Sequence, residues 1–475
     1  MITTDRMAAV DANAAALGVP QKQLMESSGN AVARAVRDLV DPGSRIAIVA
    51  GRGNNGGDAL VAARFLDEFD THTLLLGRAE TISTDIAREN WDALDEAKYD
   101  VEEVQDSRAI GLGDPDLVVD AMLGTGISGD LREPEATAAR EMNESDATVL
   151  SVDVPSGVDA DTGEGGAGAV EADHVVTFHD SKPGLDSLDA DVRVEDIGIP
   201  AAAERFVGPG DLAVETDPRA RKGDSGRVMV IGGGPYTGAP ALAAQSSLRA
   251  GADLAFVSIP ERVFDPIAGY AEDLIVQPYD APRLGPDQVD DLLDTATRHD
   301  DIVVLGPGLG TADETLDAVA EFLSGFDGRA VVDADALSVV PEVDTDATLV
   351  CTPNRHELAE MGGPDVDDLA AHADEIEAFA ADLGHIVLAK AKDDVISNGK
   401  RTRISRVGTP GMTVGGTGDL LAGITAAQLG TREAFDAACV APYVNGRAAE
   451  ALDRGSGLMA SDLLDAIPEA MRVDR

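Results

Sequence analysis

The 475-residue chain carries 37 Lys and Arg residues against 87 Asp and Glu residues, a formal net charge of −50. A field of that sign repels nucleic-acid phosphates and anionic lipid headgroups, so we expect no nucleic-acid partner and no membrane-surface role. Hydrophobic residues still make up 44% of the chain, enough for ordinary cores. The length exceeds the roughly 100 to 200 residues of one domain, so we expect a folded acidic protein with more than one domain.

The basic and aromatic residues are also unevenly used. Arg outnumbers Lys by 30 to 7, and Phe, Trp and Tyr together reach only 3%. In molar salt the Debye length falls to about 3 Å, which screens the self-repulsion of such an acidic surface. The composition therefore predicts a halophilic, haloarchaeal source.

Two cysteines, Cys351 and Cys439, do not form a CxxC pair, which argues against a disulfide framework or a Cys-rich zinc site. The first 18 residues contain charges within their apolar part, unlike a signal peptide. No run of about 20 apolar residues suggests a membrane-spanning helix. We expect a soluble, cytoplasmic protein, and its Ala-rich helices offer association faces for a homo-oligomer.

Short β-branched runs that end in Gly-rich or Asp-rich turns alternate with Ala-rich stretches of helical period, which is typical of parallel βαβ units. A segment without sustained period, 201–224, separates two such series, so we expect two α/β domains, 1–212 and 213–475. The predicted strands of the first are 45–50, 71–76, 117–120, 148–153 and 174–178, and its predicted helices are 59–69, 82–97 and 134–142. The predicted strands of the second are 228–231, 255–259, 302–305, 330–333, 348–350 and 386–389.

Three loops of the first domain follow predicted strands. Residues 51–58 read GRGNNGGD, Asp120 precedes a second Gly-rich loop, and Asp153 precedes VPSG, which contains Ser156. A Gly-rich turn before a helix lets backbone N–H groups approach a phosphate. A lone Asp at a strand end is more often a helix cap. Three aligned strand ends, however, converge on one crevice in an open α/β sheet, which favours a ligand site containing Asn55, Asp120, Asp153 and Ser156.

The motifs GRGNNGGD, DAMLGTGISGD, SVDVPSGVD and TFHDSKPG resemble, in order, those of the YjeF N-terminal family of NAD(P)H-hydrate epimerases, over about residues 1–200. The resemblance implies a Rossmann-like three-layer α/β/α sandwich, interconversion of R and S hydrates at ring carbon six, a K⁺ ion held by Asn55, Asp120 and Ser156, and Asp153 as the acid/base group. Hard oxygen ligands suit K⁺. Lys182 of SKPG is either a phosphate contact or, as we favour, solvated. The implied substrate contacts, besides Asp153, are Asn54, Asn55, Gly56, Gly57, Asp58, Gly124, Thr125, Gly126, Ile127, Ser128, Gly129 and Asp130.

The second half contains no GxxxxGK[ST] sequence, which excludes P-loop chemistry. Its strongest element is 408–423, GTPGMTVGGTGDLLAG, where glycines precede a helix. Free N–H groups and the positive helix end there can neutralise a transferred phosphoryl group. Asp419 in the first turn could accept a proton from a substrate hydroxyl; the alternative is a cap of the helix.

Together with GPGLG, VDADAL and TPNRHE, this segment resembles the ribokinase-like ADP- or ATP-dependent NAD(P)H-hydrate dehydratases, over about residues 222–464. The resemblance implies a ribokinase-like α/β domain that phosphorylates the hydrate hydroxyl and then eliminates phosphate, with Asp419 as the base and the amides of 415–418 around the phosphoryl group. Where that family reads TPHxGE and KGxxT, this chain has TPNRHE and KAKDD, so Asn354 or His356 replaces a histidine, and two acids near a polyphosphate call for Mg²⁺. The implied hydrate contacts are Ala239, Gly308, Asn354 and Asp419, and the implied nucleotide contacts are Lys390, Ala391, Lys392, Asp393, Asp394 and Gly418.

The leading hypothesis is a bifunctional repair enzyme that epimerises NAD(P)H hydrate and dehydrates the S form with ADP or ATP. One alternative is a small-alcohol kinase of the thiamine-precursor type, with an N-terminal domain that binds nucleotide without catalysis. Another is an N-terminal scaffold module, which would not need a charged K⁺ pocket. The choices between ADP and ATP and between the NADH and NADPH hydrates stay open.

Overall fold

The computed structural model describes residues 1–126, 129–213 and 225–472, and the chain divides into two compact units, Met1–Ala203 and Glu204–Arg475. The division falls within the short helix α6 (Ala201–Arg205), earlier than the expected boundary at 212/213. The intervening residues pack with the second unit because Arg403 forms an ion pair with Asp211 at 2.6 Å, and Arg432 donates to the carbonyl of Leu212 at 2.8 Å.

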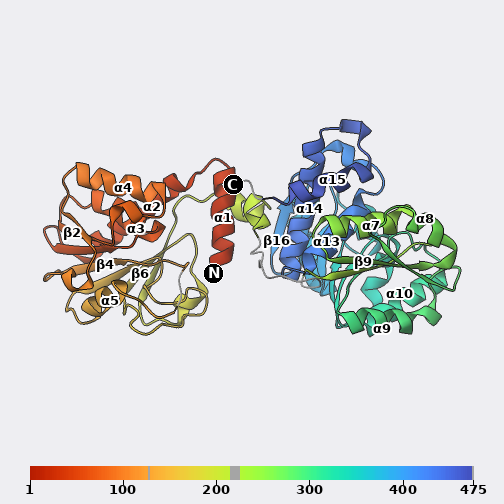
Figure 1. The fold of residues 1–475 in the computed structure, drawn as a ribbon, viewed down its shortest axis with the longest axis horizontal. Helices are drawn as coiled ribbons and strands as arrows, with labels where there is room; N and C mark the ends of the chain where they lie inside the picture. Colours follow the sequence, from red (N-terminus) through yellow and green to blue (C-terminus); the bar gives the residue numbers. More distant parts are fainter. Residues whose placement is uncertain (127–128, 214–224, 473–475) are drawn as a thin grey trace. The chain divides into compact units, whose positions relative to one another are not determined.

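Unit 1 contains a seven-stranded, entirely parallel sheet in the order β3-β2-β1-β4-β5-β6-β7 (Figure 1). The order reverses between β1 and β4, as in dinucleotide-binding folds. Its strands are β1 (Arg45–Ala50), β2 (Asp70–Leu76), β3 (Val101–Val104), β4 (Leu117–Ala121), β5 (Thr148–Val152), β6 (His174–Phe178) and β7 (Asp191–Glu195). Its helices, before α6, are α1 (Thr4–Ala16), α2 (Gln21–Leu39), α3 (Asn54–Arg64), α4 (Asp85–Glu96) and α5 (Glu135–Asn143).

Alternating residues of the strands build a core on each face of this sheet. Ile46 and Ile48 of β1 pack with helices α1 to α4, whereas Ala47 and Val49 pack with α5. Both faces are buried because a parallel sheet is covered by its own crossover helices. The expected three-layer α/β/α arrangement of this domain is confirmed.

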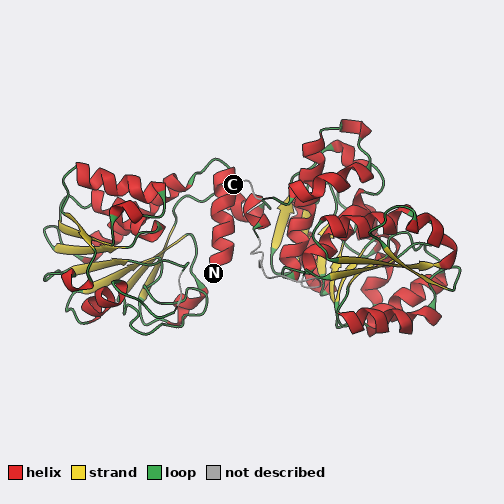
Figure 2. Ribbon diagram, viewed as in Figure 1, coloured by secondary structure: helices red, strands yellow, loops and turns green. Residues whose placement is uncertain are grey.

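Unit 2 is built on a nine-stranded sheet in the order β10-β9-β8-β11-β12-β13-β14-β15-β16, parallel except for the two antiparallel pairings of β15. Strands of each unit are drawn in yellow and helices in red in Figure 2. Its strands are β8 (Arg227–Ile231), β9 (Leu254–Pro260), β10 (Ile275–Tyr279), β11 (Ile302–Leu305), β12 (Arg329–Val332), β13 (Thr348–Cys351), β14 (Ile386–Ala389), β15 (Asp394–Ser397) and β16 (Thr402–Ser405). Its helices are α7 (Gly238–Arg249), α8 (Phe264–Ala268), α9 (Val289–His299), α10 (Asp313–Gly325), α11 (Arg355–Glu360), α12 (Ala373–Leu383), α13 (Thr417–Leu429), α14 (Ala434–Leu452) and α15 (Ala460–Ala470).

This sheet also lies between two helical layers. Helices α7, α13, α14 and α15 pack with Val228 and Val230 of β8 on one face, and α9 and α10 pack with Met229 and Ile231 on the other. Two α/β domains are thereby confirmed. The hydrophobic runs predicted the strands in the middle of each sheet except the buried β15, and they missed the four edge strands β3, β7, β10 and β16.

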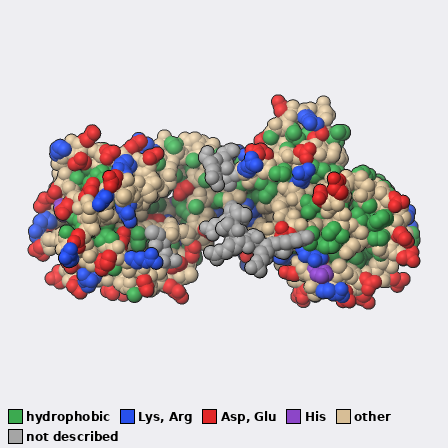
Figure 3. Space-filling view, in the orientation of Figure 1, with side chains coloured by type: hydrophobic (Ala, Val, Ile, Leu, Met, Phe, Trp, Pro, Cys, Tyr) green, Lys and Arg blue, Asp and Glu red, His purple; other side chains and the backbone are tan. Residues whose placement is uncertain are grey.

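One predicted helix is displaced: the segment expected at 59–69 is α3, which begins at Asn54 within the Gly-rich loop and ends at Arg64. Among the described residues, the helices include none that is long and apolar enough to cross a membrane. Acidic side chains are scattered over the visible surface of each unit (Figure 3).

Candidate active sites

In unit 1 the candidate site lies at the carboxyl ends of β1 and β4, where the strand order reverses. Gly51 follows β1, and a Cβ on it would lie 1.7 Å from the carbonyl oxygen of Met122, which follows β4. Only glycine permits this approach of two backbones. The Gly-rich loop and the second loop therefore meet, as the aligned strand ends predict.

A cavity of about 660 Å³ opens at this point, with mixed polar and apolar walls. The lining carries both charges: Arg52 contacts Thr81 and Ser83, and the acidic residues that line the cavity are Asp11, Asp58, Glu135 and Asp153. Of the predicted substrate contacts, seven line the cavity: Asn54, Asn55, Asp58, Gly124, Thr125, Gly126 and Asp153.

The other predicted contacts in unit 1 do not line the cavity. Gly56 and Gly57 are buried in α3, where a Cβ would collide with the carbonyl of Gly51 or the side chain of Met25, so close packing explains both glycines. Asp130 accepts a hydrogen bond from the backbone N–H of Ala167 at 2.8 Å. Gly129 also lies outside the cavity lining, and Ile127 and Ser128 lie outside the described residues.

The three residues expected to hold K⁺ are brought together. Asp120 is fully buried, and its carboxylate accepts hydrogen bonds from Ser156 Oγ at 2.6 Å, Ser156 N at 2.9 Å and Ser151 Oγ at 2.8 Å. No Lys or Arg of the described residues pairs with it, and burial raises its pKa despite these donors. Asn55 donates Nδ2 to the carbonyl of Leu123 at 2.8 Å, and its buried Oδ1 has no hydrogen-bond partner among the described residues. A buried carboxylate without a counter-ion beside an unpartnered amide oxygen suits a hard monovalent cation.

Asp153 is joined to Lys182, and the interpretation of Lys182 as a solvated side chain is wrong. Lys182 Nζ lies 2.6 Å from Asp153 Oδ1, and its side chain is 1% exposed. The turn after β6 directs the lysine inward, where it also donates to Thr177 Oγ1 at 2.7 Å and the carbonyl of Phe178 at 3.1 Å. Sequence reasoning missed this because burial of a lysine requires partners that only the fold brings together.

Two further carboxyl groups face the same cavity. Burial and the charge of Asp153 raise the pKa of Asp11 to about 6, and the same causes raise the pKa of Asp58 well above its ordinary value. Asp11 was not predicted as a site residue: it lies on α1, ahead of the first strand, where no motif marks it. Carboxyl groups with separated pKa values are suited to acid and base roles.

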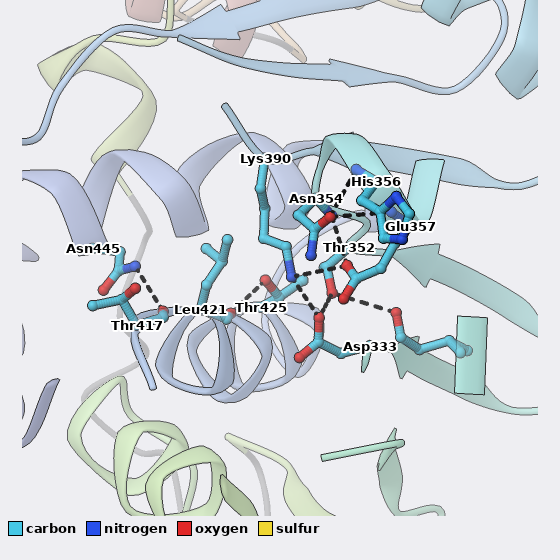
Figure 4. A network of polar contacts seen from close by, with 11 residues as sticks. Asp333, Thr352, Asn354, His356, Glu357, Lys390, Thr417, Leu421, Thr425 and Asn445 are labelled. Atoms are coloured by element: carbon cyan, nitrogen blue, oxygen red, sulfur yellow. Dashed lines mark hydrogen bonds and ion pairs between the residues drawn. The ribbon is translucent and has the colours of Figure 1, made fainter. Parts of the chain in front are cut away.

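In unit 2, polar side chains follow three neighbouring strands of the sheet (Figure 4). Asp333 follows β12, Thr352 follows β13 and Lys390 follows β14. Asp333 Oδ1 accepts hydrogen bonds from Thr352 Oγ1 and from Lys390 Nζ, both at 2.7 Å. The position of Asp333 directly after a predicted strand, like that of Asp120 and Asp153, is the signal that could have identified it.

Asp419 and Gly418 lie in the first turn of α13, as expected. A Cβ on Gly418 would lie 3.4 Å from Lys390 Nζ, so the ammonium adjoins the positive end of this helix. Burial, then the charge of Asp333, raises the pKa of Asp419 to about 7, although Lys390 opposes the shift. A carboxyl with that pKa is suited to general-base catalysis near neutral pH.

Asn354 caps a helix in this structure. Its Oδ1 accepts hydrogen bonds from the backbone N–H groups of His356 at 2.8 Å and Glu357 at 3.1 Å, while Glu357 accepts from the N–H of Asn354 at 2.7 Å. The His356 side chain is 85% exposed and lies beside Glu360. Glu357 lies 3.7 Å from Lys390 Nζ, so the polar group that this segment adds to the network is Glu357, which was not predicted.

In the predicted nucleotide loop, residues 390–394, the carboxylate of Asp394 points into the loop and the side chain of Lys392 is exposed. Asp394 accepts a hydrogen bond from the backbone N–H of Ala391 at 2.9 Å, which closes the loop, and burial raises its pKa to about 7. Lys392 is exposed and Asp393 is partly buried. Within the part of the chain that the structure describes, no group of three His, Cys, Asp or Glu residues could hold a metal ion by itself.

The remaining predicted hydrate contacts lie on neighbouring elements of unit 2. Ala239 is in the first turn of α7. Gly308 follows β11 with φ +75°, and a Cβ there would lie 3.0 Å from the carbonyl oxygen of Tyr236. Gly306, with φ +128°, passes so close to Asp333 that a Cβ would lie 1.8 Å from its carbonyl oxygen. Glycine thus brings the β11 turn against both β12 and the segment before α7.

Comparisons with known proteins agree with this division into two sites. The family model described as YjeF-related protein N-terminus matches residues 21–184, and the model described as NAD(P)H-hydrate dehydratase matches residues 228–469. Bifunctional NAD(P)H-hydrate repair enzymes from Methanothermobacter thermautotrophicus and Pyrobaculum aerophilum are 41% and 42% identical, over 98% and 99% of this chain and 94% and 98% of theirs. The solved ADP/ATP-dependent NAD(P)H-hydrate dehydratase of Bacillus subtilis, co-crystallised with ATP/Mg²⁺, is 23% identical over 56% of this chain and 97% of its own, with a TM-score of 0.48. The chain therefore belongs to the family of bifunctional NAD(P)H-hydrate repair enzymes.

Proposed function

We propose that unit 1 epimerises the R and S hydrates of NADH or NADPH, and that unit 2 dehydrates the S form at the expense of ADP or ATP. The observation that carries the first assignment is the Asp153 carboxylate on the wall of a cavity large enough for part of a dinucleotide. Arg52, Thr81 and Ser83 at another part of the wall offer a cation and hydroxyl groups to phosphate. The hydrated ring would then lie toward Asp153.

Inversion of the carbinolamine carbon needs a group that removes and returns a proton. Asp153 takes the proton of the ring hydroxyl as the O–H electron pair forms a C=O bond and the C–N pair moves to the ring nitrogen. The same carboxyl gives the proton to that nitrogen. Closure by the reverse steps on the opposite face of the carbonyl gives the other epimer, so no oxidant or reductant is needed.

We place K⁺ at Asn55, Asp120 and Ser156. Its support is the unpartnered Oδ1 of Asn55 beside the buried, uncompensated carboxylate of Asp120. The bound cation would supply positive potential close to the phosphates of the substrate. Ser156 Oγ donates to Asp120 at 2.6 Å and accepts a hydrogen bond from the backbone N–H of Leu123, in the second loop, at 3.0 Å, so the loop and the cation site are coupled.

In unit 2 we assign Asp419 as the base that takes the proton of the hydrate hydroxyl while that oxygen attacks the terminal phosphorus of the nucleotide. The raised pKa of this partly buried carboxyl supports the role. Lys390 and the N–H groups at the start of α13 neutralise the transferred phosphoryl group. As the new P–O bond forms, the P–O bond to the rest of the nucleotide breaks, and the nucleotide leaves with one phosphate fewer. The phosphate on the hydrate then leaves with the C–O electron pair, and loss of a proton from the neighbouring ring carbon forms the C=C bond of the reduced nicotinamide. Mg²⁺, when bound, would supply positive charge to the nucleotide phosphates.

The test is a coupled assay on separated R and S hydrates, with ADP and ATP in turn, in molar KCl. The S hydrate should regenerate reduced-nicotinamide absorbance with nucleotide alone, and the R hydrate should do so through unit 1. An Asp153→Ala variant should lose only the R reaction. If neither hydrate is consumed while small alcohols are phosphorylated, the kinase alternative replaces this proposal.

A further inference from the structure

Lys182 is unusual because its side chain is buried and its ammonium contacts three hydrogen-bond acceptors. They are Asp153 Oδ1, Thr177 Oγ1 and the carbonyl of Phe178, at 2.6, 2.7 and 3.1 Å. An ammonium has three N–H donors, so these contacts use all of them. Lys182 therefore has no donor left for a phosphate, although its side chain borders the cavity.

The two oxygens of Asp153 are in different situations. Oδ1 accepts from Lys182 and also from Thr177 Oγ1 at 3.0 Å. Oδ2 accepts no hydrogen bond from the described residues, and 18% of the side chain is exposed, in the wall of the cavity. The carboxylate is thus fixed through one oxygen and leaves the other to a ligand.

The backbone around this pair is also constrained. Asp153 comes directly after β5 with φ +65°, a left-handed conformation that costs a non-glycine residue about 1 kcal/mol or more. Its N–H donates to the carbonyl of Val176 in β6 at 2.7 Å. The neighbouring strand β6 therefore supplies two groups. The carbonyl of Val176 accepts the hydrogen bond of this turn, and Thr177 contacts both Lys182 and Asp153.

A purely structural ion pair is a poor explanation of this arrangement. Moving an ammonium and a carboxylate out of water costs several kcal/mol per ion, and apolar side chains of similar size would stabilise the fold equally well. The pair lies at the cavity wall, and Asp11 and Asp58 line that cavity too. Of these three acids, Asp153 is the one that forms an ion pair with Lys182.

We infer that Lys182 is the positioning residue of the epimerase: it holds Oδ1 of Asp153 and thereby presents Oδ2 to the hydroxyl of the hydrate. This inference rests on the proposed epimerase function. The ammonium does not touch substrate; it acts through Asp153. With Lys182 in place, Oδ2 of Asp153 is directed to the hydroxyl, accepts its proton in the ring-opening step and returns the proton to the ring nitrogen.

Asp153 shares the cavity with Asp11 of α1, Asp58 of α3 and Glu135 of α5. Among the described residues, Lys182 forms its ion pair with Asp153 and with none of these three carboxyl groups. Loss of Lys182 should therefore free the Asp153 carboxylate to rotate, which should lower the rate of proton transfer more than it weakens substrate binding.

The experiment compares Lys182→Met with Lys98→Met, which makes the same change at an exposed lysine outside the cavity. Lys182→Met should lower kcat for the R hydrate by about 100-fold, the effect typical of losing a positioned base, and should leave KM within about threefold of wild type. Its dehydratase activity, measured on the S hydrate in the same samples, should equal that of wild type, and Lys98→Met should match wild type in both reactions.

A second variant covers the case in which Lys182→Met fails to fold unit 1. Thr177→Val keeps the ammonium but removes one donor to Asp153 Oδ1, and it should lower kcat by about tenfold with little change of KM. A kcat of folded Lys182→Met within about threefold of wild type overturns the inference, as does a rise of KM with kcat unchanged. If wild type itself fails to convert the R hydrate, the proposed epimerase function is wrong. If wild type converts the R hydrate and both variants convert it equally well, the epimerase function stands and only the role of Lys182 is wrong.

Discussion

The pH dependence of the dehydratase follows from the surroundings of Asp419. Burial and the nearby carboxylate of Asp333 raise the pKa of Asp419 from 3.8 to about 7. A base must be deprotonated to accept a proton, so activity should be lost as the pH falls through this value. The ionised fraction is about 0.9 at pH 8 and about 0.1 at pH 6 for such a group. We therefore expect kcat/KM for the S hydrate to fall about tenfold between these pH values.

The measurement is the recovery of reduced-nicotinamide absorbance from the S hydrate at saturating nucleotide and Mg²⁺, from pH 5.5 to 8.5 at constant KCl. Asp419→Asn keeps the size of the side chain and should lose about 100-fold or more in activity. Its residual rate should lack the acid limb. A profile that is flat over this range in wild type, or a limb that persists in Asp419→Asn, would refute the assignment of Asp419 as the base.

Three further results are expected. Asp120→Asn removes the buried charge beside Asn55 and should weaken K⁺ stimulation of epimerisation by about tenfold or more; unchanged K⁺ dependence in a titration with KCl against LiCl would argue against the cation site. Gly51→Ala places a Cβ 1.7 Å from a carbonyl oxygen, whereas Gly53 has nothing within 4 Å of that position, so Gly51→Ala should destabilise unit 1 by more than about 1 to 3 kcal/mol and Gly53→Ala by much less, as read from thermal unfolding. The net charge of −50 predicts that the melting temperature rises between 0.1 M and 1 M KCl, where the Debye length shrinks from about 10 to about 3 Å; a falling melting temperature would contradict the halophilic interpretation.

The strand interiors and the Gly-rich turns could be predicted from local sequence. Strands such as β1 and β11 are short, β-branched and flanked by glycine, because both faces of a parallel sheet are buried. Edge strands carry no such signal: β3 reads VEEV and β7 reads DVRVE. Solvent on one side lets charged residues alternate with apolar ones, so these segments resemble loops in a single sequence.

The candidate sites divide in the same way. Asp120, Asp153 and Asp419 could be found because each lies at the carboxyl end of a strand or in the first turn of a helix, close to glycines. The contacts of Asn354 and Lys182 could not be predicted, because they depend on the folded structure. Asn354 caps the start of a helix, and Lys182 contacts Asp153 and a residue of strand β6. At Gly56 and Gly57 the structure adds a packing reason for glycine, since a Cβ would collide with the carbonyl of Gly51 or with Met25, and their predicted contact with substrate stays a prediction.

By itself, the sequence determined most of the central strands, the Gly-rich turns that follow them, the presence of two α/β domains and the family, because those follow from hydrophobic period and from motifs that are contiguous in the chain. The tertiary structure decided which charges meet. Lys182 reaches Asp153 across 29 positions, and Lys390 reaches Asp333 across 57. A buried charge is stable only with partners in place, and those partners are set by how parallel strands align their ends, which is a property of the folded sheet.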